Sequence, residues 1–174
     1  MNGKSIETPV VTLRAIEPED LDFLYQIEND HAIWYVSNTN EPYSRYLLHD
    51  YLSRATGDIY TDKQVRMVIV GQQGESIGMV DLQNFEPAHS RAEVGIAILD
   101  EYRCQGYGLA ALCSLKAYAC NVLHLHQLYA YVDANHEASL SLFSHAGFQR
   151  QVLLQDWLYS GSIYHNAYLL QCFL

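Results

Sequence analysis

The chain has 174 residues, 49% of them hydrophobic, and a formal net charge of −10. This length fits one domain with a proper buried core, and the apolar fraction excludes a disordered chain. The excess of carboxylates excludes a nucleic-acid-binding surface, which needs clustered Lys and Arg, and instead suits a cationic small molecule.

The hydrophobic pattern predicts strands and helices along the whole chain. In chain order we expect a strand over 10–16, helices over 17–30 and 43–55, strands over 65–71, 75–85 and 91–99, a helix over 108–121, a strand over 127–133, a helix over 137–148, and two strands around 160–162. The three central strands are joined by short turns and therefore form an antiparallel meander. This order predicts a single α/β domain over 1–174, whose mixed, mostly antiparallel sheet is flanked by about four helices.

Several expected features concern the cellular location. No apolar run approaches the ~18 residues that a membrane span needs, and the first residues lack the apolar centre of a signal peptide. The four cysteines show neither C-x-x-C pairs nor disulfide-framework spacing. We therefore expect a reduced, cytoplasmic protein without a membrane partner.

The segment EYRCQGYGLAAL, residues 101–112, fits two phosphate-binding patterns. Gly106, Gly108 and Ala111 match the dinucleotide fingerprint G-x-G-x-x-A, but that loop should follow the first strand of a parallel βαβ unit, and here it follows an antiparallel meander. Arg103, Gly106 and Gly108 match R-x-x-G-x-G, in which the bare amides at a helix start bind a pyrophosphate. A glycine-started helix without a ligand is the remaining alternative.

The residues RAEVGIAILDEYRCQGYGLAAL closely resemble the acetyl-CoA-binding motif of the GNAT superfamily of N-acetyltransferases. LRAIEPEDLDFL and NHEASLSLFSHAGF resemble the opening and closing blocks of that family in the same order, so the resemblance covers nearly the whole chain. It is nearest to the branch of ribosomal-protein N-terminal and spermidine acetyltransferases. The resemblance implies direct transfer of an acetyl group from acetyl-CoA, the co-substrate, to a primary amine of a polyamine-like small cation or of a protein N-terminus.

The resemblance also implies which residues contact acetyl-CoA. They are a strand edge, a loop and the start of a late helix: Ile96, Ala97, Ile98, Leu99, Arg103, Cys104, Gln105, Gly106, Tyr107, Gly108, Leu109, Asn135, His136, Ser139 and Phe143. An amide near Ile98 is expected to polarise the thioester carbonyl. His136 replaces a frequent Asn, Cys104 a frequent Gly, and Phe143 the Tyr that protonates the leaving thiolate. Phe143 and His136 motivate the alternative of a non-catalytic acyl-CoA-binding sensor module.

The proton acceptor for the amine should be a carboxylate. An alkylamine has a pKa of about 10.4, so only about one molecule in a few thousand is neutral at pH 7. Glu93 occupies the position where many family members carry such a group, and Asp81 is the second candidate; a solvated Glu93 paired with Arg91 is the structural alternative.

Three further carboxylates, Glu28, Asp30 and Glu41, precede or follow a tyrosine-rich stretch and are candidates for binding a cationic acceptor, with a solvated surface as the alternative. His124 and His126 have a spacing that could ligate a metal, but no further ligand is apparent, so we expect no metal site. A homodimer is plausible, and the C-terminal residues 166–174 are one segment through which it could form.

Overall fold

A computed structural model of the protein describes residues 9–30 and 41–174. The strands are β1 (Thr12–Ala15), β2 (Val65–Val70), β3 (Ser76–Glu86), β4 (Arg91–Ile98), β5 (Gln127–Asp133), β6 (Gln149–Ser160) and β7 (Ile163–Phe173). The α-helices of the described part are α1 (Leu21–Glu28), α3 (Arg45–Arg54), α4 (Ile59–Asp62), α5 (Tyr107–Asn121) and α6 (Glu137–His145). The short 3-10 turns are η1 (Pro18–Asp20), η2 (Pro87–His89) and η3 (Asp100–Tyr102).

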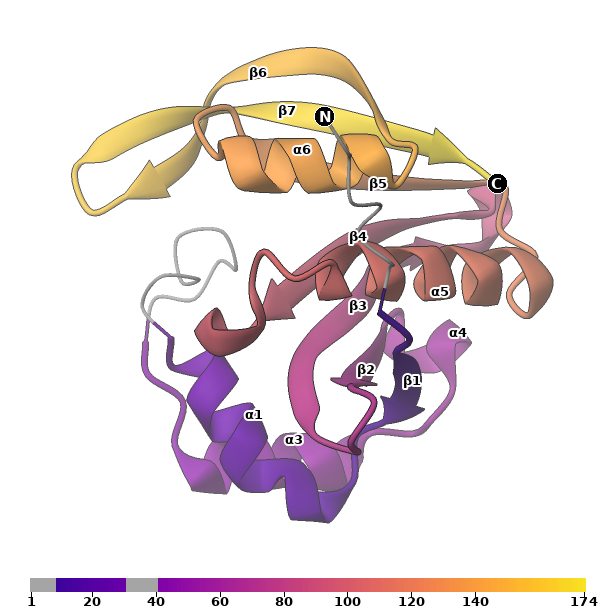
Figure 1. Ribbon diagram of the computed structural model, residues 1–174, viewed down its shortest axis with the longest axis vertical. Coiled ribbons are helices and arrows are strands. Elements are labelled where there is room, and N and C mark those ends of the chain that lie inside the picture. Colours follow the sequence, from indigo (N-terminus) through magenta and orange to yellow (C-terminus); the bar gives the residue numbers. More distant parts are fainter. Residues whose placement is uncertain (1–8, 31–40) are drawn as a thin grey trace, which may run out of the picture.

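All seven strands form one sheet in the order β1-β2-β3-β4-β5-β7-β6. Every neighbouring pair is antiparallel except β4 and β5, which run parallel. This confirms the predicted mixed, mostly antiparallel sheet and removes the dinucleotide-binding alternative, whose parallel strands are missing from the described sheet. Figure 1 shows two groups of elements: β1 to β4 with α1, α3 and α4, and β5 to β7 with α6; α5 lies between them.

Local sequence explains most element boundaries. The first helix begins as the turn η1 because Pro18 suits a first helical position, and Glu17 and Asp20 form a reciprocal capping box there. Ser44 caps α3 by accepting a hydrogen bond from the Leu47 N–H at 3.1 Å. The last predicted helix ends at His145, earlier than expected, because Gly147 adopts φ of +91°.

The two faces of the sheet pack against different helices. Ile96 and Ile98 of β4 lie in the cluster that contains Leu112 and Leu115 of α5. Ala97 and Leu99 lie in a second cluster with buried leucines and isoleucine of α1 and α3. Because side chains alternate along a strand, β4 contributes to both layers at once. Side-chain packing on both faces of the sheet therefore holds the second half of β4 in place.

The C-terminal residues lie inside the sheet and not at its edge. Residues 166–173 belong to β7, which is paired with β5 on one side and β6 on the other, so both edges of its backbone are occupied along these pairs. The edge strand is β6 instead. In the described part of the chain, no helix has the length and apolar character needed to cross a bilayer.

Candidate active site

The sheet opens between β4 and β5 after a ladder of three residue pairs. The last pair is Glu93 with Tyr129, yet β4 continues to Ile98 and β5 to Asp133. Within the described residues no pairing joins the two strands beyond this point. The two strands therefore form a fork, with Glu93 and Tyr129 at its base. Residues 96–99, which the resemblance assigns to acetyl-CoA contact, lie beyond the last pair.

Main-chain groups of β4 line one side of the fork. The Leu99 N–H donates to the Ile77 carbonyl of the β3 side at 3.0 Å. Hydrogen-bonded and non-bonded pairs alternate in an antiparallel ladder, so Ala97 and Leu99 bond toward β3 while Ile96 and Ile98 turn their N–H and C=O groups toward the fork. Among the predicted cofactor residues 96–99, Ile96 and Ile98 are therefore the two whose main-chain groups face away from β3 and toward a ligand in the fork. The Ile98 N–H accordingly points the way its expected role requires.

Arg103 closes the outer end of this edge. Its Nε donates to the Ile98 carbonyl oxygen at 2.8 Å, and its guanidinium pairs with Asp100. The same guanidinium lies 3.8 Å from the carboxylate of Asp30. The predicted cofactor loop and one predicted acceptor-binding carboxylate therefore meet, although they are more than seventy residues apart in the sequence.

The loop before α5 delivers unpaired amides to the same region. Gly106 has φ of +88° and precedes the helix, and no side chain among the described residues caps it. The first helical bond inside α5 is from the Ala110 N–H to the Gly106 carbonyl at 3.1 Å, which leaves the N–H groups of Tyr107, Gly108 and Leu109 without helical partners. A bare helix start is a favourable place for a pyrophosphate, so the residues present fit acetyl-CoA.

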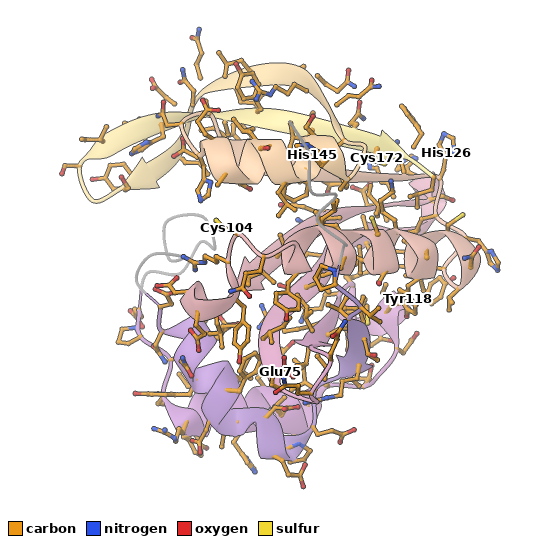
Figure 2. The ribbon with its side chains drawn as sticks, in the orientation of Figure 1. Glu75, Cys104, Tyr118, His126, His145 and Cys172 are labelled. Carbon is orange, nitrogen blue, oxygen red and sulfur yellow. The ribbon has the colours of Figure 1, made fainter. Side chains whose placement is uncertain are left out.

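The glycine at position 106 is required by conformation and by space. A Cβ there would lie 2.9 Å from Cδ of Pro9, and the left-handed φ already disfavours any other residue. Cys104 also adopts a positive φ of 58°, and its exposed side chain is labelled on this loop in Figure 2. Gln105 anchors the loop by donating to the Glu101 carbonyl at 2.6 Å.

The start of α6 holds the other predicted cofactor residues. His136 caps the helix, because its Nδ1 accepts the N–H of Ser139 at 3.0 Å, and the Asn135 N–H donates to Oδ1 of Asp133 at 2.7 Å. Phe143 is 3% exposed, and its ring meets Phe148 edge-on at 5.0 Å. Two of the three departures from the family pattern thus have structural uses: His136 as a helix cap and Phe143 as a core residue.

Glu93 is held as a partly buried carboxylate. Its Oε2 accepts a hydrogen bond from Nδ2 of Asn84 at 2.8 Å. Burial raises the pKa of Glu93 above the ordinary glutamate value, and the Asn84 amide offsets part of that rise. Arg91 pairs with Glu86 at 2.9 Å rather than with Glu93, so the alternative of a surface ion pair with Arg91 is wrong. Tyr129 lies opposite, and burial followed by the charge of Glu93 raises the pKa of Tyr129 to about 12.

Asp81 and Glu28 converge on one guanidinium from two elements. Arg66 of β2 pairs with Asp81 at 2.9 Å and with Glu28 of α1 at 2.6 Å. Burial raises the pKa of Glu28, while Arg66 opposes that rise. For Arg66, burial would lower the pKa, but the two carboxylates outweigh it and raise it. Asp81 is therefore already engaged by a cation, whereas Glu93 has an amide partner. Glu41 is exposed near the start of α3 and is not part of this group.

Sequence reasoning missed three residues that shape this site: Asn84, Tyr129 and Arg66. Asn84 lies at a register shift in β3 with φ of 47°, and no motif marks such a position. Tyr129 becomes the neighbour of Glu93 only through the parallel pairing of β4 with β5. For Arg66 a signal existed, because a meander with the right register places a β2 arginine opposite the β3 aspartate.

A sheet forked between two parallel strands, with a bare helix start on one side and the partly buried carboxylate of Glu93 at its base, fits an acyl-CoA-dependent acyltransferase. Residues 11–149 match the model of the acetyltransferase (GNAT) domain, and the chain belongs to this family. It is an acetyl-CoA-dependent N-acetyltransferase, as the resemblance implied.

Spermidine acetyltransferases are among the proteins to which this chain is similar. Spermidine N(1)-acetyltransferase of Escherichia coli K12 is 31% identical over 166 residues, covering 90% of this chain and 82% of that protein. Spermidine N(1)-acetyltransferase of Vibrio cholerae is 27% identical, covering 92% and 93%. The crystal structure of spermidine N-acetyltransferase from Vibrio cholerae in complex with CoA and spermine superposes with a TM-score of 0.84 at 25% identity, covering 94% of this chain and 95% of that one.

Proposed function

We propose that this chain, acting as a single domain, acetylates a primary amine of a polyamine such as spermidine, with Glu93 as the proton acceptor. The observation that carries the proposal is the position of Glu93 at the base of the fork, where burial raises its pKa and an amide rather than a cation contacts it. The resemblance to the family, which assigned this position to the base, supports the same role.

The chemistry requires an uncharged nitrogen that attacks the thioester carbonyl. An alkylammonium of pKa about 10.4 must first lose a proton, and a carboxylate whose pKa is raised is a better acceptor near neutral pH than an ordinary one. Glu93 takes this proton directly or through one water. The Ile98 N–H, turned toward the fork, stabilises the negative charge that develops on the carbonyl oxygen. Phe143 donates no proton, so the thiolate, of reference pKa about 8.5, leaves without that help.

We assign the binding of acetyl-CoA to backbone more than to side chains. The amides of Tyr107, Gly108 and Leu109 suit the pyrophosphate, and the N–H and C=O of Ile96 with the N–H of Ile98 suit an amide-containing arm. Residues Asn135, His136 and Ser139 are proposed as secondary contacts. Acetyl-CoA supplies the activated acetyl group when it is bound.

The acceptor is proposed to be a polycation because carboxylates lie on its side of the sheet. Glu28 ends α1, Asp30 follows that helix and Asp81 is in β3, and all three lie within 4 Å of the guanidinium of Arg66 or Arg103. The net charge of −10 favours the approach of a cation. The spermidine acetyltransferases among the similar proteins support a polyamine over a protein N-terminus.

The proposal is tested by following thiol release from acetyl-CoA with spermidine, spermine, a ribosomal-protein N-terminal peptide and amino acids. We expect turnover with the polyamines alone. The Glu93→Gln variant should lose about 10²-fold or more in kcat, while Glu19→Gln, an exposed change in η1, should leave it unaltered. Turnover of the peptide alone would refute the polyamine assignment, and an unchanged Glu93→Gln enzyme would remove Glu93 from the base role.

We further propose that the chain self-associates and is cytoplasmic. The edge strand β6 exposes apolar side chains, among them Val152, Leu153 and Trp157, each at least 43% exposed. A dodecameric spermidine N-acetyltransferase from Vibrio cholerae is among the similar structures, with a TM-score of 0.79. Light scattering coupled to gel filtration, with Trp157→Glu as the test variant, should show a smaller particle for the variant than for the parent.

A cytoplasmic location would keep the three exposed cysteines reduced.

A further inference from the structure

Three side chains near the β6–β7 hairpin lie in the order of a nucleophile, a base and an orienting acid. Oγ of Ser160 is 2.7 Å from Nε2 of His165. Nδ1 of the same imidazole is 3.3 Å from Oδ2 of Asp133. None of the three belongs to the residues that we assign to amine acetylation.

The fold holds this group in place from two strands. Ser160 and His165 are on opposite sides of the hairpin, in the paired ends of β6 and β7. Asp133 is at the end of β5 and pairs in register with Ala167 of β7. Its side chain is buried, and Oδ1 is fixed by the N–H of Asn135. The carboxylate therefore presents its other oxygen to the imidazole with little freedom to move away.

This arrangement determines the direction of the hydrogen bonds. A carboxylate beside Nδ1 favours the tautomer that carries the proton there, so Nε2 becomes an acceptor and Ser160 the donor. A serine hydroxyl that donates to a neutral imidazole is activated as a nucleophile, because its proton has a place to go as the oxygen attacks.

The imidazole is reached from outside the molecule. An open depression of about 430 Å³ is lined by Asp133, Asn135, His136, Glu137, Ala138 and His165. His165 retains 24% exposure while Asp133 retains 4%. Ser160 is not one of these lining residues, but its side chain is partly exposed and its Oγ lies 2.7 Å from the imidazole that faces the depression. The volume suits a small acyl ester, and since none of these six described residues is Lys or Arg, a neutral or cationic ester fits best.

We propose that Ser160, His165 and Asp133 form a second site, which hydrolyses short-chain acyl esters. Ser160 Oγ attacks the ester carbonyl and its proton passes to Nε2; the bond to the leaving oxygen breaks, and that oxygen takes the proton. Water then attacks the acetyl-serine, giving its proton to Nε2, and the serine oxygen recovers it as acetate is released. No oxidant, metal or further reactant enters this balance. The site differs from the fork at Glu93, where acetyl passes directly to nitrogen.

The test uses p-nitrophenyl acetate as the probe, with the full-length protein and with neither CoA nor amine present. Its outcome is thus independent of the proposed polyamine activity. We expect Ser160→Ala and His165→Gln to lower the rate of p-nitrophenol release about 10²-fold. Ser162→Ala, the same change two residues away in the turn, should leave the rate unaltered. Peptide mass spectrometry after acid quenching should place one acetyl group on Ser160.

A third variant distinguishes lost chemistry from lost folding. Ser160→Cys supplies a nucleophile in the same position and should again give an acetylated residue 160, provided that its thermal midpoint matches that of the parent. A Ser160→Ala protein that hydrolyses the ester within twofold of the parent would overturn the proposal. So would acetylation that appears on other residues and not on 160 in the parent or in the Ser160→Cys variant.

Discussion

Replacing Arg66 by Met should destabilise the protein far more than the loss of an ordinary arginine. Two carboxylates, Glu28 and Asp81, share the guanidinium of Arg66 at distances of 2.6 and 2.9 Å. The three side chains are 24%, 12% and 14% exposed, so water screens them only in part. Met keeps much of the volume and removes the charge, which leaves two carboxylates facing each other in a poorly solvated place.

The magnitude follows from that geometry. Breaking a buried ion pair by removing one partner costs about 3–5 kcal/mol, because the other charge stays buried. Arg66→Met breaks two ion pairs, but one of the two carboxyl groups can take up a proton and so avoid a buried charge. We therefore expect a total loss of about 3–5 kcal/mol in free energy of unfolding near neutral pH, and not twice that amount. With a urea m-value of about 2 kcal/mol/M, the midpoint should fall by about 2 M.

The pH dependence has a definite sign. Burial raises the pKa of Glu28 in the folded protein, and the charge of Arg66 partly opposes that rise. Removing Arg66 should therefore raise the pKa of Glu28 further. A carboxyl with a raised folded pKa stabilises the protein below its unfolded pKa, and that stability is lost as pH rises through the folded pKa. The difference in free energy of unfolding between the parent and the Arg66→Met variant should therefore shrink on acidification from pH 7 toward pH 4.

Urea unfolding followed by tryptophan fluorescence measures these effects. Arg54→Met is the matched control, because Arg54 pairs with Asp50 at 2.9 Å on an exposed face of α3, where a pair contributes about 0.5 kcal/mol or less. Glu28→Gln combined with Arg66→Met should recover part of the loss. A deficit for Arg66→Met below 1 kcal/mol, or one that does not change with pH, would refute the reasoning about buried charge.

The remaining predictions concern the fork, the loop and the first turn. Asn84→Ala removes the amide that holds down the pKa of Glu93, so the acidic limb of the kcat/KM profile should move to higher pH; an unmoved limb would contradict this. Gly106→Ala should weaken CoA binding about tenfold by calorimetry, whereas Gly74→Ala, at φ of +85° with open space around it, should cost only stability. Asp20→Asn should lower the free energy of unfolding by about 1–2 kcal/mol at pH 7, because Arg14 of β1 lowers the pKa of the Asp20 carboxyl. The stability that this carboxylate contributes is lost as pH falls through its folded pKa. Urea unfolding curves of parent and variant should therefore differ at pH 7 and approach each other at pH 3.

Periodic patterns in the sequence predicted nearly every long element, and the structure confirms their order. The miss in the described part is α4, which is only four residues long and too short to show a helical period. The overextended last helix has a plain reason, since Gly147 ends it and still lies inside an apolar run. Patterns with several repeats therefore predicted well, and features that depend on one residue's backbone conformation did not.

The candidate site divides in the same way. The loop around Gly106 was found because its amides must cluster in sequence as well as in space. The environment of Glu93 was not, because Asn84 reaches it through a register shift and Tyr129 through a parallel pairing 36 residues away. The sharing of Arg66 by Glu28 and Asp81 likewise depends on how α1 docks against the sheet, which no local pattern encodes.

The three-pair ladder between β4 and β5 has a consequence for how the protein folds. The meander β2–β3–β4 and the hairpin β6–β7 close through short turns, but each β4–β5 pair joins residues that are 36 apart in the sequence, with all of α5 between them. Closing a loop of this length costs more chain entropy and is slower than closing a turn, and only three residue pairs between β4 and β5 offset that cost in the described sheet. We expect the two groups of strands to form early and separately, and amide exchange at the junction to report their docking as the last event.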